Sequence, residues 1–293
     1  MMVTQPATAP LFDTMARLNA LDADLLGAAP GPLEAGWFRA DALLREGAPE
    51  LREGLARQAA RYAGMDRRTA GSFFVNEYAW YVFAGPIGAL LAERRAPELD
   101  PANLALRFRG YTWEEDGETG EAERIDARFL SGRCAVLPDD PAAGLPGVTV
   151  LSDEGALREW LRAGLEAHVT PLIERVHAAT RLGRRAQWNL VADACAGQFL
   201  NAGKLLGDPA RAQAEGLAFV RAAGSPMCNP GTGYITLECA GHTGTFRARG
   251  GCCRYYTVGD GDKCTTCVLR PAEERDQRLR EYLARQYAVA APA

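Results

Sequence analysis

The stretch Gly251-Cys252-Cys253-Arg254-Tyr255-Tyr256-Thr257-Val258-Gly259-Asp260-Gly261-Asp262-Lys263-Cys264-Thr265-Thr266-Cys267 holds four of the eight cysteines in this chain. Cys252 and Cys253 are adjacent, and Cys264 and Cys267 follow after ten residues with the spacing Cys-x-x-Cys. A cysteine that only packs in a core behaves as a small hydrophobic residue, so a core role does not explain four cysteines close together in the sequence. The stretch therefore predicts four thiolates that gather around a metal.

The residues between the two pairs predict how the cysteines could meet. Arg254 to Val258 is rich in β-branched and aromatic side chains, which favours a short extended strand. Gly259 to Asp262 alternates glycine with aspartate, which is typical of a tight turn. A hairpin of this kind would carry Cys264 back toward Cys253, and the Cys-x-x-Cys loop would offer two sulfurs to one centre.

The kind of metal follows less directly from the spacing. A structural zinc site usually takes two well-spaced pairs of ligands around one tetrahedral ion. Adjacent side chains such as Cys252 and Cys253 tend to point apart, so they chelate a single small ion poorly. A binuclear [2Fe–2S] rhomb is larger and takes two thiolates per iron. The spacing favours an iron–sulfur cluster, and a zinc site is the open alternative.

The motif Cys252-Cys253-x10-Cys264-x2-Cys267, with its flanking arginines and the Tyr255-Tyr256 pair, resembles the C-terminal cluster motif of the FhuF-like ferric siderophore reductases. In that family these four cysteines bind a [2Fe–2S] cluster that reduces iron held by hydroxamate-type siderophores. Residues 160–271 resemble the family more loosely, and the first 150 residues add little. The resemblance implies an oxidoreductase that releases Fe(II) in the cytoplasm and takes electrons from a separate ferredoxin, flavodoxin or reductase.

Composition limits what the whole chain can be. With 293 residues, 47% of them hydrophobic and 24% charged, it can fold around one large core or two smaller ones. The formal net charge is −4 and basic residues are interspersed with acids, so no electrostatic footprint for nucleic acid is present. Met1 to Pro10 lacks the features of a secretory signal, so we expect reduced cysteines and a cytoplasmic location.

The longest apolar run, Ala79 to Ala92, is shorter than the roughly 20 residues that a membrane-spanning helix needs. We interpret it as a buried helix pair that is broken at Gly85-Pro86. The alternative is a surface that associates peripherally with the membrane.

Hydrophobic periodicity predicts an α+β fold that is predominantly helical, with a small antiparallel sheet and a C-terminal cysteine-rich iron–sulfur subdomain. Four regions are expected. Residues 1–100 form an N-terminal helical region, residues 101–151 a small β region, residues 152–224 a second helical region, and residues 225–293 the [2Fe–2S]-binding subdomain with its closing helix.

Several local features follow from the same pattern. Leu104 to Arg109 and Arg124 to Phe129 alternate between apolar and polar residues and are expected to form strands. The acidic segment Glu114 to Glu123 is expected to be a solvated loop between them. Gly27 to Pro32 is predicted as a connector, and Thr170-Pro171 is expected to interrupt or restart a long helix.

A siderophore pocket is expected between the helical region and the cluster subdomain. The candidates nearest to the cysteines in sequence are Arg249, Arg254, Tyr255 and Tyr256. The arginines could favour the more negative reduced cluster and hold an anionic ligand, or they could belong to a solvated mixture of charges. In a strand, Tyr255 and Tyr256 would point to opposite faces, so at most one would face the pocket.

The remaining cysteines and one histidine are interpreted mainly as core residues. Cys134, Cys195 and Cys239 lie on apolar strand or helix faces, and His168 lies on a helical apolar stripe that favours a hydrogen-bonded core position. Cys228 is in a loop ahead of the cluster motif, where it could line the cluster pocket or replace a ligand.

The sequence leaves two other functions open. One is an iron–sulfur electron carrier or sensor without a chelate pocket, and the other is a zinc-stapled binding module. The helical region also resembles, faintly, a domain that siderophore synthetases share with the reductases. No Walker or Rossmann glycine fingerprint is present to hold a nucleotide, so electrons are expected to come from a partner protein.

Overall fold

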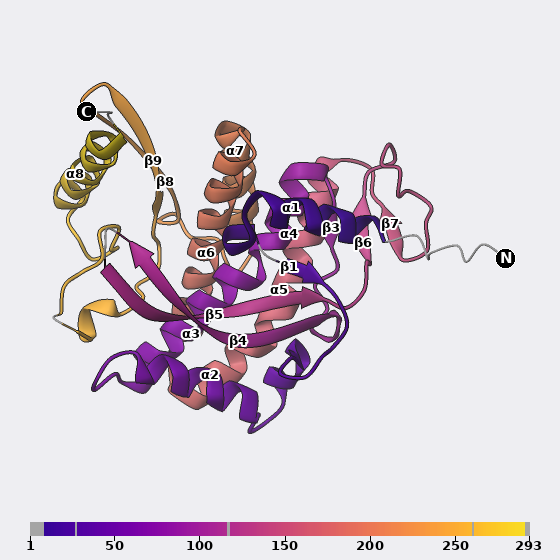
Figure 1. Cartoon of the computed structure of the whole chain (residues 1–293), viewed down its shortest axis with the longest axis horizontal. Helices are drawn as coiled ribbons and strands as arrows, with labels where there is room; N and C mark the ends of the chain where they lie inside the picture. Colours follow the sequence, from indigo (N-terminus) through magenta and orange to yellow (C-terminus); the bar gives the residue numbers. More distant parts are fainter. Residues whose placement is uncertain (1–8, 27, 116–117, 260, 291–293) are drawn as a thin grey trace.

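The computed structural model describes residues 9–26, 28–115, 118–259 and 261–290, and it confirms an α+β chain with a large helical part. Figure 1 shows a helical body, a long two-stranded hairpin that crosses one of its faces, and a C-terminal arm at one side. The cysteine-rich segment lies between the arm and the body. This arrangement brings distant parts of the chain to the four clustered cysteines.

Helix α6, Arg184–Leu205, is the centre of the helical body. Most of its residues are buried because it packs against α3, α4 and α7. Its many alanines favour the helix and allow close helix neighbours. The other helices of the body are α1 (Pro10–Leu26), α2 (Pro49–Ala60), α3 (Arg67–Val82), α4 (Ala84–Glu93), α5 (Glu154–Thr180) and α7 (Pro209–Val220).

Three helices, α3, α5 and α7, begin after an aspartate whose side chain caps the first turn. Asp66 caps α3 by accepting a hydrogen bond from the Thr69 N–H at 2.7 Å. The apolar run contributes to α3 and α4, so the expected helix pair is present, with its break at Phe83. The expected break at Gly85-Pro86 is wrong, because both residues lie in the first turn of α4, where the N–H that proline lacks would have no partner within the helix. The expected interruption at Pro171 is wrong, because α5 continues through it. Proline has a helical φ and removes one backbone hydrogen bond, and the buried stripe on both sides holds the helix together.

The large hairpin consists of β4, Leu104–Glu115, and β5, Glu118–Phe129, in antiparallel register. Both strands extend well into the segment that was expected to be an acidic loop, because the backbone ladder continues past the apolar alternation. The tip of the hairpin at residues 116–117 lies outside the described residues. Strand β1, Ala28–Pro30, pairs in parallel with β5. The predicted connector at 27–32 is therefore wrong over residues 28–30, because pairing with β5 makes them a strand. Residue 27 is not described.

Shorter elements complete the body. A four-stranded sheet has the order β1-β5-β4-β2, and a three-stranded sheet has the order β3-β6-β7. The other strands of these two sheets are β2 (Phe38–Arg39), β3 (Ala96–Pro97), β6 (Cys134–Val136) and β7 (Val148–Val150). Two 3-10 turns lie next to them, η1 (Ala40–Leu44) and η2 (Pro101–Asn103).

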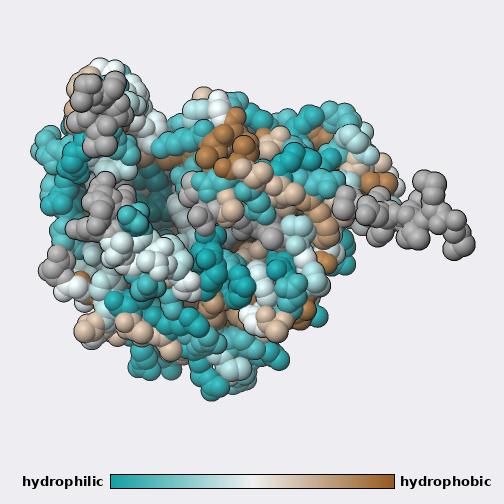
Figure 2. All heavy atoms as spheres, viewed as in Figure 1, coloured by the Kyte–Doolittle hydropathy of each residue, from teal (hydrophilic) through white to brown (hydrophobic). Residues whose placement is uncertain are grey.

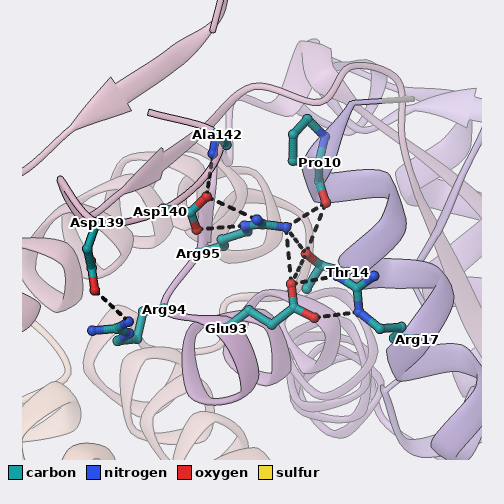
Figure 3. A network of polar contacts seen from close by, with 9 residues as sticks. All are labelled: Pro10, Thr14, Arg17, Glu93, Arg94, Arg95, Asp139, Asp140 and Ala142. Atoms are coloured by element: carbon teal, nitrogen blue, oxygen red, sulfur yellow. Dashed lines mark hydrogen bonds and ion pairs between the residues drawn. The ribbon is translucent and has the colours of Figure 1, made fainter. Parts of the chain in front are cut away.

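A polar network around Arg95 ties the N-terminal helix to the rest of the body (Figure 3). The Arg95 guanidinium donates to both carboxylate oxygens of Asp140 at 2.9 and 3.0 Å. It also donates to the Pro10 carbonyl at 2.9 Å and to the Thr14 hydroxyl at 3.0 Å, both in α1. Arg95 is buried, so these bonds compensate for the loss of water around its charge.

The C-terminal arm consists of β8, Gly233–Cys239, β9, His242–Ala248, and α8, Ala272–Ala290. The helix packs on the hairpin, with the ring of Tyr287 stacked on His242 at 3.6 Å between centroids. Figure 2 shows the surface hollowed between this arm and the body, with mainly hydrophilic residues along the hollow. Among the described residues, no helix combines the length and apolar character needed to cross a membrane.

Candidate metal centre

A buried carboxylate on α6 holds the chain just ahead of the first cysteine pair. The Asp193 side chain accepts hydrogen bonds from the backbone N–H groups of Gly250 at 2.8 Å and Gly251 at 2.9 Å. It also accepts from the Thr232 hydroxyl at 2.7 Å, and it is fully buried. Three hydrogen bonds to one buried carboxyl group fix the backbone that leads into Cys252.

The segment after the first pair is held by α3 and does not form the predicted strand. Arg254 has a left-handed backbone conformation with φ of 62°, and residues Tyr255–Thr257 form the 3-10 turn η3. The Ser72 hydroxyl donates to the Cys253 carbonyl at 2.6 Å, and the Arg254 guanidinium donates to Asp66 at 2.8 Å. These contacts with α3 outweigh the local preference for an extended strand. The predicted hairpin between the cysteine pairs is therefore wrong; its residue 260 is not described.

The sulfur atoms nevertheless come together. One nitrogen of Arg249 lies 3.6 Å from Cys253 Sγ and 3.7 Å from Cys264 Sγ. A hydrogen bond from the Cys264 thiol holds the pKa of Cys253 well below its usual value, and the Arg249 charge acts in the same direction. Burial raises the pKa of Cys252, and the nearby Cys253 and Cys267 add to that rise. The four thiols thus lie within electrostatic reach of one another.

The second pair is held by a buried arginine. Cys267 donates its backbone N–H to the Cys264 carbonyl at 3.0 Å, which closes the Cys-x-x-Cys turn. Arg270 donates its Nε to the same carbonyl at 3.1 Å and forms an ion pair with Asp262 at 3.0 Å. It also contacts the Lys263 carbonyl. The turn is therefore anchored from its C-terminal side.

The donor set fits a binuclear iron–sulfur cluster. Thiolates are soft ligands that such clusters use, and hydrogen bonds to the sulfurs help to set their reduction potential. Here the Arg249 guanidinium reaches Cys253 and Cys264, and the Arg254 backbone N–H lies 3.4 Å from Cys252 Sγ. Among the described side chains, no group of three or more Cys, His, Asp or Glu residues is arranged to hold a metal ion. The residues that could hold a [2Fe–2S] group are the predicted four: Cys252, Cys253, Cys264 and Cys267.

A cleft of about 420 Å³ opens beside these thiols. Cys253, Cys264 and Arg249 line this cleft together with side chains of α3 and of the β4–β5 hairpin. Its other lining residues are Arg61, Phe73, Asn76, Glu77, Trp80, Tyr81, Tyr111, Ala122, Glu123, Arg247 and Tyr255. One cysteine of each pair thus faces a space that is built mainly from residues more than a hundred positions away in the chain.

The four residues predicted for the pocket separate into two groups. Arg249 and Tyr255 line the cleft. Arg254 lies at a different hollow, where it pairs with Asp66, and Tyr256 is 37% exposed and is not among the described lining residues. Neighbours in sequence therefore lie on different sides of the cysteine segment, because the left-handed residue 254 turns the chain.

The cleft combines cations, aromatic rings and a partly neutralised acid. Arg247 lies 5.2 Å from the centroid of the Trp80 ring, and burial, followed by repulsion from Arg249, lowers its pKa to about 10. Burial raises the pKa of Glu77 to about 7, although Gln58 and Arg61 both donate hydrogen bonds to it. Such a site suits a polar ligand with apolar edges.

Sequence reasoning missed the residues that position the cysteines from a distance. Asp193 had a detectable signal, because a carboxylate between Val191, Ala192, Ala194 and Cys195 on an apolar helix must be buried and therefore needs partners. Ser72 and Arg270 had none. Among the other cysteines, Cys134 and Cys195 are buried as expected, whereas Cys239 is only partly buried. Cys228 lies 3.7 Å from the Arg221 carbonyl and is not among the described lining residues of the cleft.

Comparison with known proteins identifies this part of the chain. Residues 249–269 match the family model described as the FhuF 2Fe-2S C-terminal domain. The match spans both cysteine pairs together with Arg249, and it confirms the predicted [2Fe–2S] cofactor and the resemblance to FhuF-like proteins. No curated protein and no solved structure shows significant similarity to the chain.

Proposed function

We propose that Cys252, Cys253, Cys264 and Cys267 bind the [2Fe–2S] cluster and that the protein reduces ferric iron held by a siderophore in the adjoining cleft. The observation that carries this proposal is the position of Cys253 and Cys264 in the wall of the cleft. A cluster bound there would be close to a chelate in the cleft, and electron transfer needs such a short gap. The cleft volume of about 420 Å³ falls in the range of small-molecule sites, about 300–1,000 Å³.

When bound, the cluster supplies one electron, which converts Fe³⁺ in the chelate to Fe²⁺. No bond of the chelator needs to break, because hard oxygen ligands such as hydroxamates hold the smaller, more highly charged Fe³⁺ far better than Fe²⁺. The electron is replaced by a separate donor such as a ferredoxin, flavodoxin or reductase. We assign the release of Fe²⁺ to the cytoplasm, and contact with the membrane surface stays a prediction.

The residues around the cleft would bind and orient the chelate. Trp80 and Tyr255 offer ring faces to its apolar edges, and Arg61 and Arg249 offer cations to its oxygen atoms. Glu77 lies near Arg61 and would limit the positive charge of the wall when it is ionised. This set replaces Arg254 and Tyr256, which lie outside the cleft, as the proposed substrate contacts.

The test begins with anaerobic purification and visible and EPR spectra of the dithionite-reduced protein. Reduced protein is then mixed with a ferric trihydroxamate in the presence of a ferrous-iron trap. One ferrous ion should form for each cluster that is reoxidised. Replacing Trp80 with leucine should raise the chelate concentration at half-maximal rate, because the Trp80 ring lines the cleft. Replacing Arg52, which is exposed on α2, should have no effect.

Two outcomes would contradict the proposal. A cluster that is reduced normally but is reoxidised no faster with the chelate than without it would indicate an electron carrier or sensor. A colourless protein with one zinc ion and no acid-labile sulfide would indicate a zinc-stapled module.

A further inference from the structure

A second hollow, of about 280 Å³, adjoins the cysteine segment away from the cleft. It lies where the N-terminal end of α3, the C-terminal end of α5 and the residue after Cys253 meet. Its lining residues are Asp66, Arg67, Arg68, Thr180, Arg181 and Arg254, which we call the basic hollow. Four arginines and one aspartate give it an excess of positive charge.

Little of this positive charge is compensated. Asp66 is occupied by the Arg254 guanidinium at 2.8 Å and by capping α3. Arg67, Arg68 and Arg181 are exposed, and within the described part of the chain none of their guanidinium groups has a hydrogen bond or an ion pair. The chain as a whole has 37 acidic and 33 basic residues, so the basic hollow is a local reversal of its overall charge.

The basic hollow is directly connected to the cluster-binding segment. The Arg254 side chain lines it, while the backbone N–H of the same residue lies 3.4 Å from Cys252 Sγ. Thr69, in the first turn of α3, accepts from Arg254 Nε at 3.0 Å, and Ser72 donates to the Cys253 carbonyl at 2.6 Å. The cysteine segment therefore borders two separate openings, the basic hollow near Cys252 and the cleft at Cys253 and Cys264.

We propose, on the basis of the function proposed above, that the basic hollow docks an acidic one-electron carrier protein with an iron–sulfur or flavin centre. The carrier loses one electron and the cluster gains it through the Cys252 side. The same electron then passes to Fe³⁺ in the cleft. Complementary charge steers such an encounter and makes its rate depend on salt. Because the two openings are separate, the donor and the chelate can be bound at the same time.

The test uses the holoprotein with a photoreduced acidic plant-type ferredoxin in stopped flow. The variant carries Arg67→Glu and Arg68→Glu, both exposed in the first turn of α3, where acidic residues favour the helix. The control carries Arg52→Glu and Arg285→Glu, both exposed and absent from the lining of either opening, with the same change of net charge. At low ionic strength the variant should be reduced about tenfold more slowly, with a weaker salt dependence, and the control at nearly the wild-type rate.

Two further measurements separate this inference from the proposed function. Both variants should be reduced by dithionite, and then reoxidised by ferric trihydroxamate, at the wild-type rate. A redox-inert gallium trihydroxamate should not inhibit reduction by ferredoxin. If the wild type, the variant and the control all failed to reduce the ferric chelate, while ferredoxin reduced each of them at the rate expected above, only the proposed function would be refuted. Wild-type ferredoxin kinetics in the Arg67/Arg68 variant, equal slowing in the control, or inhibition by the gallium chelate would overturn the docking site.

Discussion

Replacing Arg249 with methionine should lower the reduction potential of the bound cluster. The Arg249 side chain is 8% exposed, and one of its nitrogens lies 3.6 Å from Cys253 Sγ and 3.7 Å from Cys264 Sγ. Its positive charge stabilises the cluster more when an electron is added, because reduction makes the cluster more negative. Methionine has a similar length, fills the same space and carries no charge.

The size of the effect follows from the distances. A metal–thiolate bond is about 2.3 Å long, so an iron bound to Cys253 would lie at most roughly 6 Å from the nearest Arg249 nitrogen. At an effective dielectric constant of about 20, two unit charges at this separation interact by about 3 kcal/mol. For a one-electron couple this corresponds to about 120 mV. Spreading of the added electron over the cluster and screening by water in the cleft reduce the shift, so we expect a decrease of about 50–120 mV.

The assay is an EPR-monitored redox titration, with the visible spectrum as a check that the cluster is intact. Arg249→Lys keeps the charge and should stay within about 30 mV of the wild type. Asp193→Asn should shift the potential upward, because it removes the carboxylate that lies 3.6 Å from Arg249 Nε. A potential in Arg249→Met that equals that of the wild type, or shifts of the same sign in Arg249→Met and Asp193→Asn, would refute the electrostatic reasoning.

Three further substitutions test the site and its surroundings. In Gly250→Ala, the new Cβ would lie 2.4 Å from Asn229 Nδ2 and 2.6 Å from Thr232 Oγ1, so we expect a destabilisation of about 1–3 kcal/mol and a lower iron content, measured by urea unfolding and iron analysis. Burial raises the pKa of Glu77 from 4.5 to about 7, so its contribution to stability is complete below pH 4.5 and is lost as the pH rises to about 7. Glu77→Gln should therefore remove a pH-dependent loss of unfolding free energy on the order of 3 kcal/mol between pH 5 and 8. An unchanged dependence of the unfolding free energy on pH would contradict the assignment. Cys228→Ser should keep the full visible absorption of the cluster, since the Cys228 thiol lies at the Arg221 carbonyl, and a colourless variant would make Cys228 a ligand.

Elements with a strong local signal were predicted well. The buried helices around Cys195 and His168 follow from apolar residues at helical spacing, and both side chains are buried as expected. His168 accepts or donates at the Tyr78 hydroxyl, 2.6 Å away, which satisfies one ring nitrogen inside the core. The strand Leu104 to Arg109 was found from its alternation, but its true end at Glu115 was not. From residue 110 to residue 115 the backbone pairing with β5 continues, but the side chains do not keep the alternation of residues 104–109 that predicted the strand.

The segment between the cysteine pairs shows the opposite case. Arg254 to Val258 has the composition of a strand, yet hydrogen bonds from Arg254 to Asp66 and Thr69 of the α3 region, and from Ser72 to the Cys253 carbonyl, hold it in a different conformation. These partners are separated from it by more than 180 residues, so no local pattern could indicate them.

By itself, the sequence determined which cofactor this protein carries. The spacing of four cysteines within a short segment is a covalent property, and thiolates prefer soft metals wherever the segment lies in the fold. Only the tertiary structure decided the surroundings of these thiols: the Asp193 anchor, the Arg249 contact with two sulfurs, and the separation of the cleft from the basic hollow. The reason is physical, because these surroundings arise from packing between distant helices and a hairpin, and packing of that kind leaves no periodic signal in the chain.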